Sequence, residues 1–171
     1  SAPTSYDAPV SRGKVNPAEV AKTKISAEWI WGDSANGGVP PADEQLAFYV
    51  TFKIDKPIQS AGAIVTCDNE FALHVNSQEL AKGNNWSQLG AVALATALRQ
   101  GENTIVIVGK NAGDTPNLAG LFFEARINFV DGQQLTIKSD SSWQFASDFP
   151  AKTPVQRWKL NEMKWQPVTV V

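Results

Sequence analysis

LAFYVTFKI, residues 46–54, alternates between apolar and polar side chains over most of its length. Its apolar set is Phe48, Val50, Phe52 and Ile54, and its polar set is Tyr49, Thr51 and Lys53. Side chains of a strand point alternately to its two faces, whereas apolar residues of a surface helix recur every three or four positions. The period of two therefore predicts a strand with one face buried in a core.

The same pattern recurs along the rest of the chain. Thr104–Val108 is apolar on both faces, as expected of a central strand. The Asp131-Gly132 pair separates two alternating segments, which predicts a β-hairpin. The further predicted strands are Ala27–Trp31, Ala61–Cys67, Phe71–Val75, Leu121–Phe129, Gln134–Lys138, Trp143–Ala146 and Gln166–Val171.

The segment Ala91–Gln100 has two interpretations. Its alanines, together with Leu94 and Leu98, are compatible with a helix that stops at Gly101. Val92 and Leu94 are equally compatible with a strand that ends in a turn. We predict a strand followed by a helical turn.

Many short strands and almost no helix predict an all-β fold, an antiparallel β-sandwich. The 171 residues suffice for one domain, which at this size buries about 70% of the surface of the unfolded chain. Residues 1–24 are polar and form a leader or linker, in which Asn16-Pro17-Ala18-Glu19 predicts a short helical turn. Residues 25–171 form the β-sandwich domain.

Composition argues against several classes of function. Fifteen basic and seventeen acidic residues give a net charge of −2, without the basic cluster that nucleic acid requires. No apolar run approaches the roughly 18 residues that span a bilayer, so membrane insertion is not expected. Cys67, the one cysteine, cannot form an intramolecular disulfide, and its position in an apolar strand predicts a small buried side chain.

Catalytic patterns are also lacking. His74 is the one histidine, it lies on the polar side of a predicted strand, and no Gly-x-Ser-x-Gly motif accompanies it. The acidic residues Asp33, Asp43, Glu44 and Asp68 could flank a glycosidic bond only if the fold brought two of them together, and the sequence does not place them. We therefore predict that the chain is not an enzyme.

Oxygen-bearing side chains cluster at two strand ends. Asp68 and Asn69 follow the strand Ala61–Cys67, and Asn111, Asp114 and Asn117 lie in the loop after Val108. If the two strands are neighbours these oxygens converge, and calcium binds six to eight such oxygens. The alternative is that Asp68-Asn69 is a turn and 111–117 a polar loop.

Six tryptophans are present, and most are expected to pack against the body of the domain. Trp29 and Trp31 share one face of a strand, so at least one of them should be in the core. Trp86 differs because it lies in the polar segment Gly83–Ser87. Its indole is either a lid over the core or a platform for a ligand.

Four segments together resemble one known domain type. They are WIW at 29–31, FYVTFKIDKP at 48–57, DNEFALHVN at 68–76 and GENTIVIVGKN at 101–111. They resemble the galactose-binding-like jelly-roll domain of bacterial α-L-rhamnosidases, which includes calcium-dependent rhamnose-binding modules, and similar modules of multidomain bacterial surface proteins. Two positions depart from the pattern: Ser77 replaces the usual Gly after Asn76, and His74 replaces a Tyr.

The resemblance implies roles for particular residues. Asp68 and Asn69 would bridge calcium and sugar hydroxyl groups, Trp86 would stack on or border the sugar, and Asn111 would complete the polar set. Asn117 would be a further calcium ligand.

The resulting prediction is a non-catalytic, calcium-assisted carbohydrate-binding module that is secreted, periplasmic or on the cell surface. Its partners would be a carbohydrate and neighbouring domains of a parent protein. The alternative is a structural or interaction domain of such a protein, without a ligand of its own.

Overall fold

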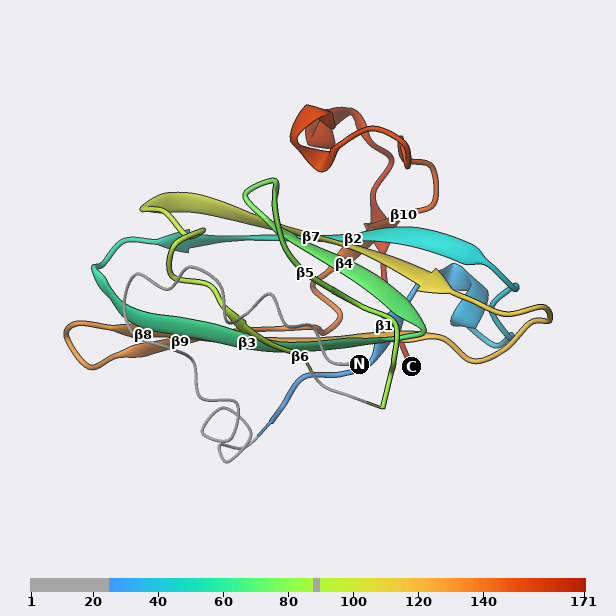
Figure 1. Ribbon diagram of the computed structural model, residues 1–171, viewed down its shortest axis with the longest axis horizontal. Helices are drawn as coiled ribbons and strands as arrows, with labels where there is room; N and C mark the ends of the chain where they lie inside the picture. Colours follow the sequence, from blue (N-terminus) through green and yellow to red (C-terminus); the bar gives the residue numbers. More distant parts are fainter. Residues whose placement is uncertain (1–24, 88–89) are drawn as a thin grey trace.

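The computed structural model describes residues 25–87 and 90–171, which form two antiparallel sheets stacked face to face (Figure 1). Sheet A has the order β12-β1-β8-β3-β6, with β9 also paired to β8, and sheet B has the order β11-β10-β2-β7-β4-β5. The strands of sheet A are β1 (Ile30–Trp31), β3 (Ile58–Asp68), β6 (Gly90–Ala93), β8 (Gly120–Phe129), β9 (Gln134–Lys138) and β12 (Thr169–Val170). Those of sheet B are β2 (Glu44–Ile54), β4 (Glu70–Val75), β5 (Gln78–Gly83), β7 (Gly101–Asn111), β10 (Gln144–Ala146) and β11 (Gln166–Pro167). This arrangement confirms the predicted jelly-roll β-sandwich.

The long strands follow the predicted alternation. The inward-facing residues of β2, β4 and β8 belong to one core between the sheets, whereas Tyr49 and His74 do not. The predicted hairpin joins β8 to β9. After β6 the chain makes one helical turn, in which Leu98 N donates to Leu94 O, so the strand-then-turn interpretation of Ala91–Gln100 is confirmed.

Three predicted strands are shorter than expected or divided in the structure. Ala27–Trp31 shrinks to β1 because the N–H groups of Ser26 and Ala27 donate to the Glu124 carboxylate instead of to a neighbouring strand. Gln166–Val171 divides into β11 and β12, since the chain crosses from sheet B to sheet A at Val168. Trp143–Ala146 loses its first residue, because Trp143 closes a turn to Asp140. The helical turn predicted at 16–19 lies outside the described residues.

Aromatic side chains fill much of the space between the sheets. Trp31 lies 5.3 Å from Phe48, and Trp143 lies 5.6 Å from Phe123, between ring centroids in both pairs. All four side chains are fully buried, and each contributes on the order of 2–3 kcal/mol by burial. Close approach of β7 to this layer requires Gly109, because a Cβ there would lie 3.2–3.3 Å from Trp31, Cys67 and Phe48.

The β4–β5 hairpin turns at Asn76 and Ser77, which have φ values of 49° and 69°. Two successive left-handed residues are the geometry of the two-residue hairpin turn that normally takes Gly second. Asn76 stabilises the turn, since its Nδ2 donates to Ala97 O and Asn103 Oδ1 and its Oδ1 accepts from Thr104 N. The turn therefore forms despite the serine.

Residues 147–165, which we name the strap, cover the outer face of sheet B (Figure 1). The strap contains the 3-10 helices η3 (Val155–Arg157) and η4 (Leu160–Glu162), whereas η2 (Asp33–Ala35) follows β1. Val155 and Trp158 pack with Ala47 and Val106 in a second buried cluster, and Trp165 stacks on Tyr49 at 4.6 Å. The strap thus explains why β7 is apolar on both faces. No described helix has the length and apolarity needed to cross a membrane.

Candidate functional site

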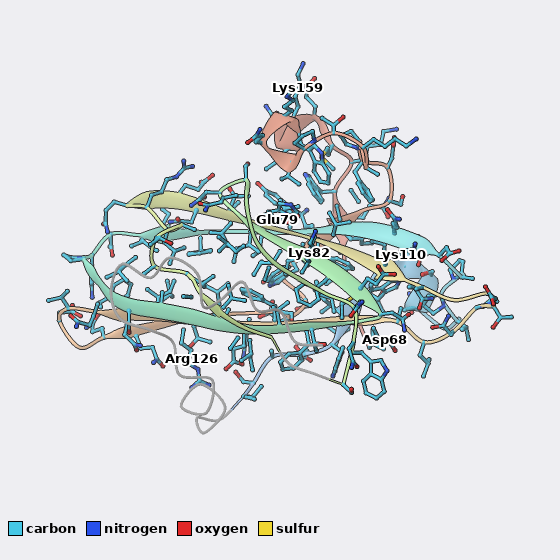
Figure 2. The ribbon with its side chains drawn as sticks, viewed as in Figure 1. Asp68, Glu79, Lys82, Lys110, Arg126 and Lys159 are labelled. Carbon is cyan, nitrogen blue, oxygen red and sulfur yellow. The ribbon has the colours of Figure 1, made fainter. Side chains whose placement is uncertain are left out.

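The two strand ends named by the sequence meet at one end of the sandwich. Strand β3 ends at Asp68, a cis peptide bond links Asp68 to Asn69, and β4 begins at Glu70. Asn69 N donates to Lys110 O over 2.9 Å, which joins this turn to the last residues of β7. Figure 2 shows Asp68 and Lys110 at the same end of the molecule. Asp68 and Asn69 are therefore close neighbours of Asn111.

Asn111 connects two loops to the end of β7. Its side chain is fully buried, and its Nδ2 lies 3.3 Å from Pro40 O, 3.0 Å from Pro41 O and 3.0 Å from Asn117 O. One amide group thus donates to three main-chain carbonyls that come from loops on either side. The conformation of both loops at this end depends on Asn111.

Two buried oxygens at this end have no hydrogen-bond partner among the residues that the structure describes. They are Asn69 Oδ1 and Asn111 Oδ1, the amide acceptors of the two residues just described. A buried acceptor without a donor costs about 1–3 kcal/mol, so such groups normally find a partner. The side chain of Asp68 is also partly desolvated, and this burial raises the pKa of its carboxyl group. Acceptor oxygens therefore exceed donors at this end of the sandwich.

Asn117 contributes through its main chain. Its carbonyl accepts from Asn111, and its N–H donates to Pro40 O over 3.2 Å. Its side-chain Nδ2 donates to Ala112 O and Thr115 O and closes its own loop. The side chain of Asn117 therefore shapes the loop, and its carbonyl is the oxygen it presents beside Asn111.

Trp86 lies on the other side of the turn. Its carbonyl accepts from Thr66 Oγ1 over 3.1 Å, and Thr66 is two residues before Asp68 on β3. The residue is 56% exposed, so it is not a lid over the core. Trp86 and Asp68 thus lie towards the outer side of β3, whereas Asn111 continues the inward-facing row of β7.

Glu44 organises the same end, a role that the sequence analysis did not assign. Its Oε1 accepts from Trp31 Nε1 over 2.8 Å and from Ser34 Oγ over 2.6 Å. It is also the direct strand partner of Asn111. Glu44 lies two residues before the inward-facing Leu46 and so on the same face of β2. This spacing is the sequence signal that could have predicted an inward-facing Glu44. Glu44 ties η2, and hence the start of the loop that carries Pro40 and Pro41, to the core.

We expect replacement of Glu44 by Leu to destabilise the domain by about 2 kcal/mol, because two donors lose a charged acceptor. Glu44→Gln keeps an amide oxygen for both donors and should cost about half as much. Urea denaturation measures both values, and the exposed neighbour Asp33 supplies the control Asp33→Asn, with an expected change below about 0.5 kcal/mol. Equal losses of stability for Glu44→Leu and Asp33→Asn would show that Glu44 does not tie η2 to the core.

Comparisons with known proteins identify the class of fold. No family model and no curated protein matches the chain. Among solved structures, the α-L-rhamnosidase of Streptomyces avermitilis complexed with L-rhamnose matches 91% of the chain with a TM-score of 0.72 and 22% identity. A Pleurotus ostreatus lectin in complex with GalNAc matches 85% with a TM-score of 0.70 and 22% identity. The α-L-rhamnosidase of Aspergillus terreus matches 92% with a TM-score of 0.67 and 19% identity.

These similarities show that the domain shares its jelly-roll fold with parts of these rhamnosidases and of this lectin. The expected resemblance is confirmed at the level of the fold. The chain spans 16% of the Streptomyces rhamnosidase, 22% of the Aspergillus enzyme and 41% of the lectin.

Proposed function

We propose that the chain is a non-catalytic carbohydrate-binding domain whose site is the sandwich end formed by Asp68, Asn69 and Asn111. The observation that carries the proposal is the pair of buried, unpaired amide oxygens, Asn69 Oδ1 and Asn111 Oδ1, at the strand ends where Asp68 also lies. Buried acceptors of this kind need a donor or a cation, and sugar hydroxyl groups are donors. The complexes of the rhamnosidase with L-rhamnose and of the lectin with GalNAc support a sugar as this partner.

Calcium suits the same set of oxygens. It prefers six to eight hard oxygen ligands, which carboxylates, side-chain amides and main-chain carbonyls supply. Asp68, Asn69 and Asn111 would hold the ion, with the carbonyl of Asn117 as a further oxygen. The donors named here are all oxygens, which suit a hard cation better than zinc. Within the part of the chain that the structure describes, no three His, Cys, Asp or Glu side chains come together. The ion would balance the charge of Asp68 while a sugar hydroxyl donates to that carboxylate.

We assign no catalytic role to this site. Glu44 is the strand partner of Asn111, and its Oε1 accepts from Trp31 and Ser34. The chain also spans a minor part of each rhamnosidase that it matches. The partial coverage supports a binding domain of a larger protein, which we propose to be secreted or surface-attached.

Calorimetric titration with L-rhamnose, GalNAc, D-galactose and D-glucose, each with calcium and with a chelator, tests the proposal. We expect at least one sugar to bind, and chelation to abolish its binding. Absence of binding by every sugar would contradict the carbohydrate function and favour a structural domain. If a sugar still binds in the presence of chelator, calcium has no part in binding, whereas the proposed sugar site stands.

Trp86→Ala should weaken sugar binding by about 1–3 kcal/mol, because an exposed indole beside Asp68 offers its face to a pyranose ring. Leu118→Ala is the matched control, since Leu118 is 71% exposed on the loop that ends beside Asp68's strand partner Gly120. Calorimetry of both variants gives the comparison. Equal affinities of Trp86→Ala and the unmodified protein would exclude the indole from the site.

A further inference from the structure

A second candidate site lies on the outer face of sheet B, and its lining contains none of the loop residues of the site described above. The strap and the β4–β5 hairpin enclose a groove over the outer face of this sheet. One part of the groove has a volume of about 310 Å³ and the adjoining part about 550 Å³. The two parts share His74, Glu79, Pro154 and Val155, so they form one continuous hollow. Its size is that of a site for a small molecule or a short oligomer.

His74 lies on the floor of this groove in a defined protonation state. Its Nδ1 is 3.3 Å from Val106 O, and because a carbonyl can only accept, Nδ1 carries the hydrogen. Burial lowers the pKa of His74, against the opposing effects of the Glu79 carboxylate and of the carbonyls of Val106 and Ala72. Burial thus favours the neutral imidazole, and with the hydrogen on Nδ1 the Nε2 atom is an acceptor.

The second nitrogen faces another acceptor. His74 Nε2 lies 3.8 Å from Glu79 Oε1, too far for a hydrogen bond and with no proton to share at neutral pH. Both atoms are hydrogen-bond acceptors that face the same space. A molecule bound there should therefore supply hydrogen-bond donors. Glu79 is exposed on β5, so a molecule in the groove can reach it from solvent (Figure 2).

Charge and composition narrow the class of this molecule. Among the groove's lining residues the charged groups at pH 7 are Glu79 and Lys152, whose charges cancel. Lys82 lies on the same face, beside Ala72, but outside the lining. The remaining lining alternates apolar groups, including Trp158, with amides and hydroxyls such as those of Gln45 and Thr153. A neutral polyol, which has apolar C–H faces and many hydroxyl groups, matches this lining better than an ion does.

We propose that the groove between the strap and β4–β5 is a second binding site, for a neutral oligosaccharide whose hydroxyl groups donate to His74 Nε2 and Glu79. This site is independent of the loops around Asp68, and a domain with both sites could hold a glycan at two points.

Because the chain has one histidine, NMR signals of the imidazole ring test this proposal directly. In 15N-labelled Asp68→Asn protein at pH 7.5, in which the first site is disabled, long-range 1H–15N spectra report the tautomer of His74. We expect the hydrogen on Nδ1. Titration with cellotetraose, xylotetraose, mannotetraose and maltotetraose should, for at least one of them, shift Nε2 and the backbone amides of residues 72–79 and 151–156 in a saturable manner.

Glu79→Leu should weaken this binding at least ten-fold, and the exposed acid Glu102 supplies the control Glu102→Leu, with no change. Binding should also decline as the pH falls through the pKa of His74, below 6.5, because Nε2 then gains a proton and no longer accepts. A hydrogen on Nε2 at pH 7.5, no shift with any tetrasaccharide, or binding that survives Glu79→Leu would each overturn the proposal. None of these results bears on sugar binding by the unmodified first site.

Discussion

Asp68→Asn should lower the affinity for sugar in the presence of calcium by about 100-fold, the largest effect that we expect on binding. The substitution keeps the size of the side chain and one acceptor oxygen but removes the charge that would face both the ion and a sugar hydroxyl. Hydrogen bonds to charged groups contribute about 1.5–3 kcal/mol, and each 1.4 kcal/mol is a factor of ten in Kd, both approximate values. Calorimetry measures the change directly.

The same variant separates a calcium ligand from a turn residue. An ion that binds the folded state raises its stability, so the unmodified domain should melt at a higher temperature in calcium, and Asp68→Asn should lose this increase. Without calcium the variant should be at least as stable, because burial raises the pKa of Asp68 and so disfavours its charged form in the folded protein. This destabilising contribution is present above the folded-state pKa and disappears as the pH falls through it.

An equal loss of melting temperature with and without calcium would make Asp68 a turn residue only. Asp114→Asn, an exposed acid in the neighbouring loop, is the control.

Asn111→Leu should have the largest effect on stability, about 3 kcal/mol. The substitution removes a donor shared by the carbonyls of Pro40, Pro41 and Asn117, at about 0.5–1.5 kcal/mol for each hydrogen bond. Urea denaturation without calcium gives the free energy of unfolding. Asn117→Ala is the matched control, since that side chain bonds only within its own loop and should cost less than about 1 kcal/mol. Similar losses for the two variants would mean that Asn111 does not join the two loops.

The alternation of apolar residues is sufficient to predict the long strands. In β2, β4 and β8 the period of two corresponds to burial between the sheets, so residues such as Phe48, Leu73 and Phe123 were placed correctly. The division of Gln166–Val171 was not predictable, because β11 and β12 have two residues each and a period of two needs a longer segment. The pairing of those short strands depends on partners that are distant in sequence.

The strap shows a second limit of sequence patterns. Trp158 and Trp165 were expected to pack on the body, and they do so on the outer face of sheet B. Each indole N–H donates to the carbonyl five residues earlier, at Thr153 and Leu160, which stabilises turns that have no apolar period. His74, expected on the polar side of its strand, is a cross-strand neighbour of Glu79, but the strap buries it. The groove is therefore a product of tertiary packing.

The sequence predicted that Asp68, Asn69 and Asn111 lie at strand ends that can meet, but not which contacts these side chains make. Asp68, Asn69 and Asn111 follow the ends of strands, which is a local property, and the backbone bond from Asn69 to Lys110 brings them together. The contacts of Pro40, Pro41 and Glu44 depend on where the loop before β2 meets the end of β7. No local sequence pattern predicts this meeting point.

The most direct measurement is a high-resolution crystal structure of the domain grown with calcium and the sugar that binds best in calorimetry. We expect a calcium ion within about 2.3–2.6 Å of Asp68 and of the amide oxygens of Asn69 and Asn111, with a sugar hydroxyl on the Asp68 carboxylate. A map in which Asn69 Oδ1 and Asn111 Oδ1 are paired with protein donors or water, and the sugar is absent from this end of the sandwich, would contradict the account.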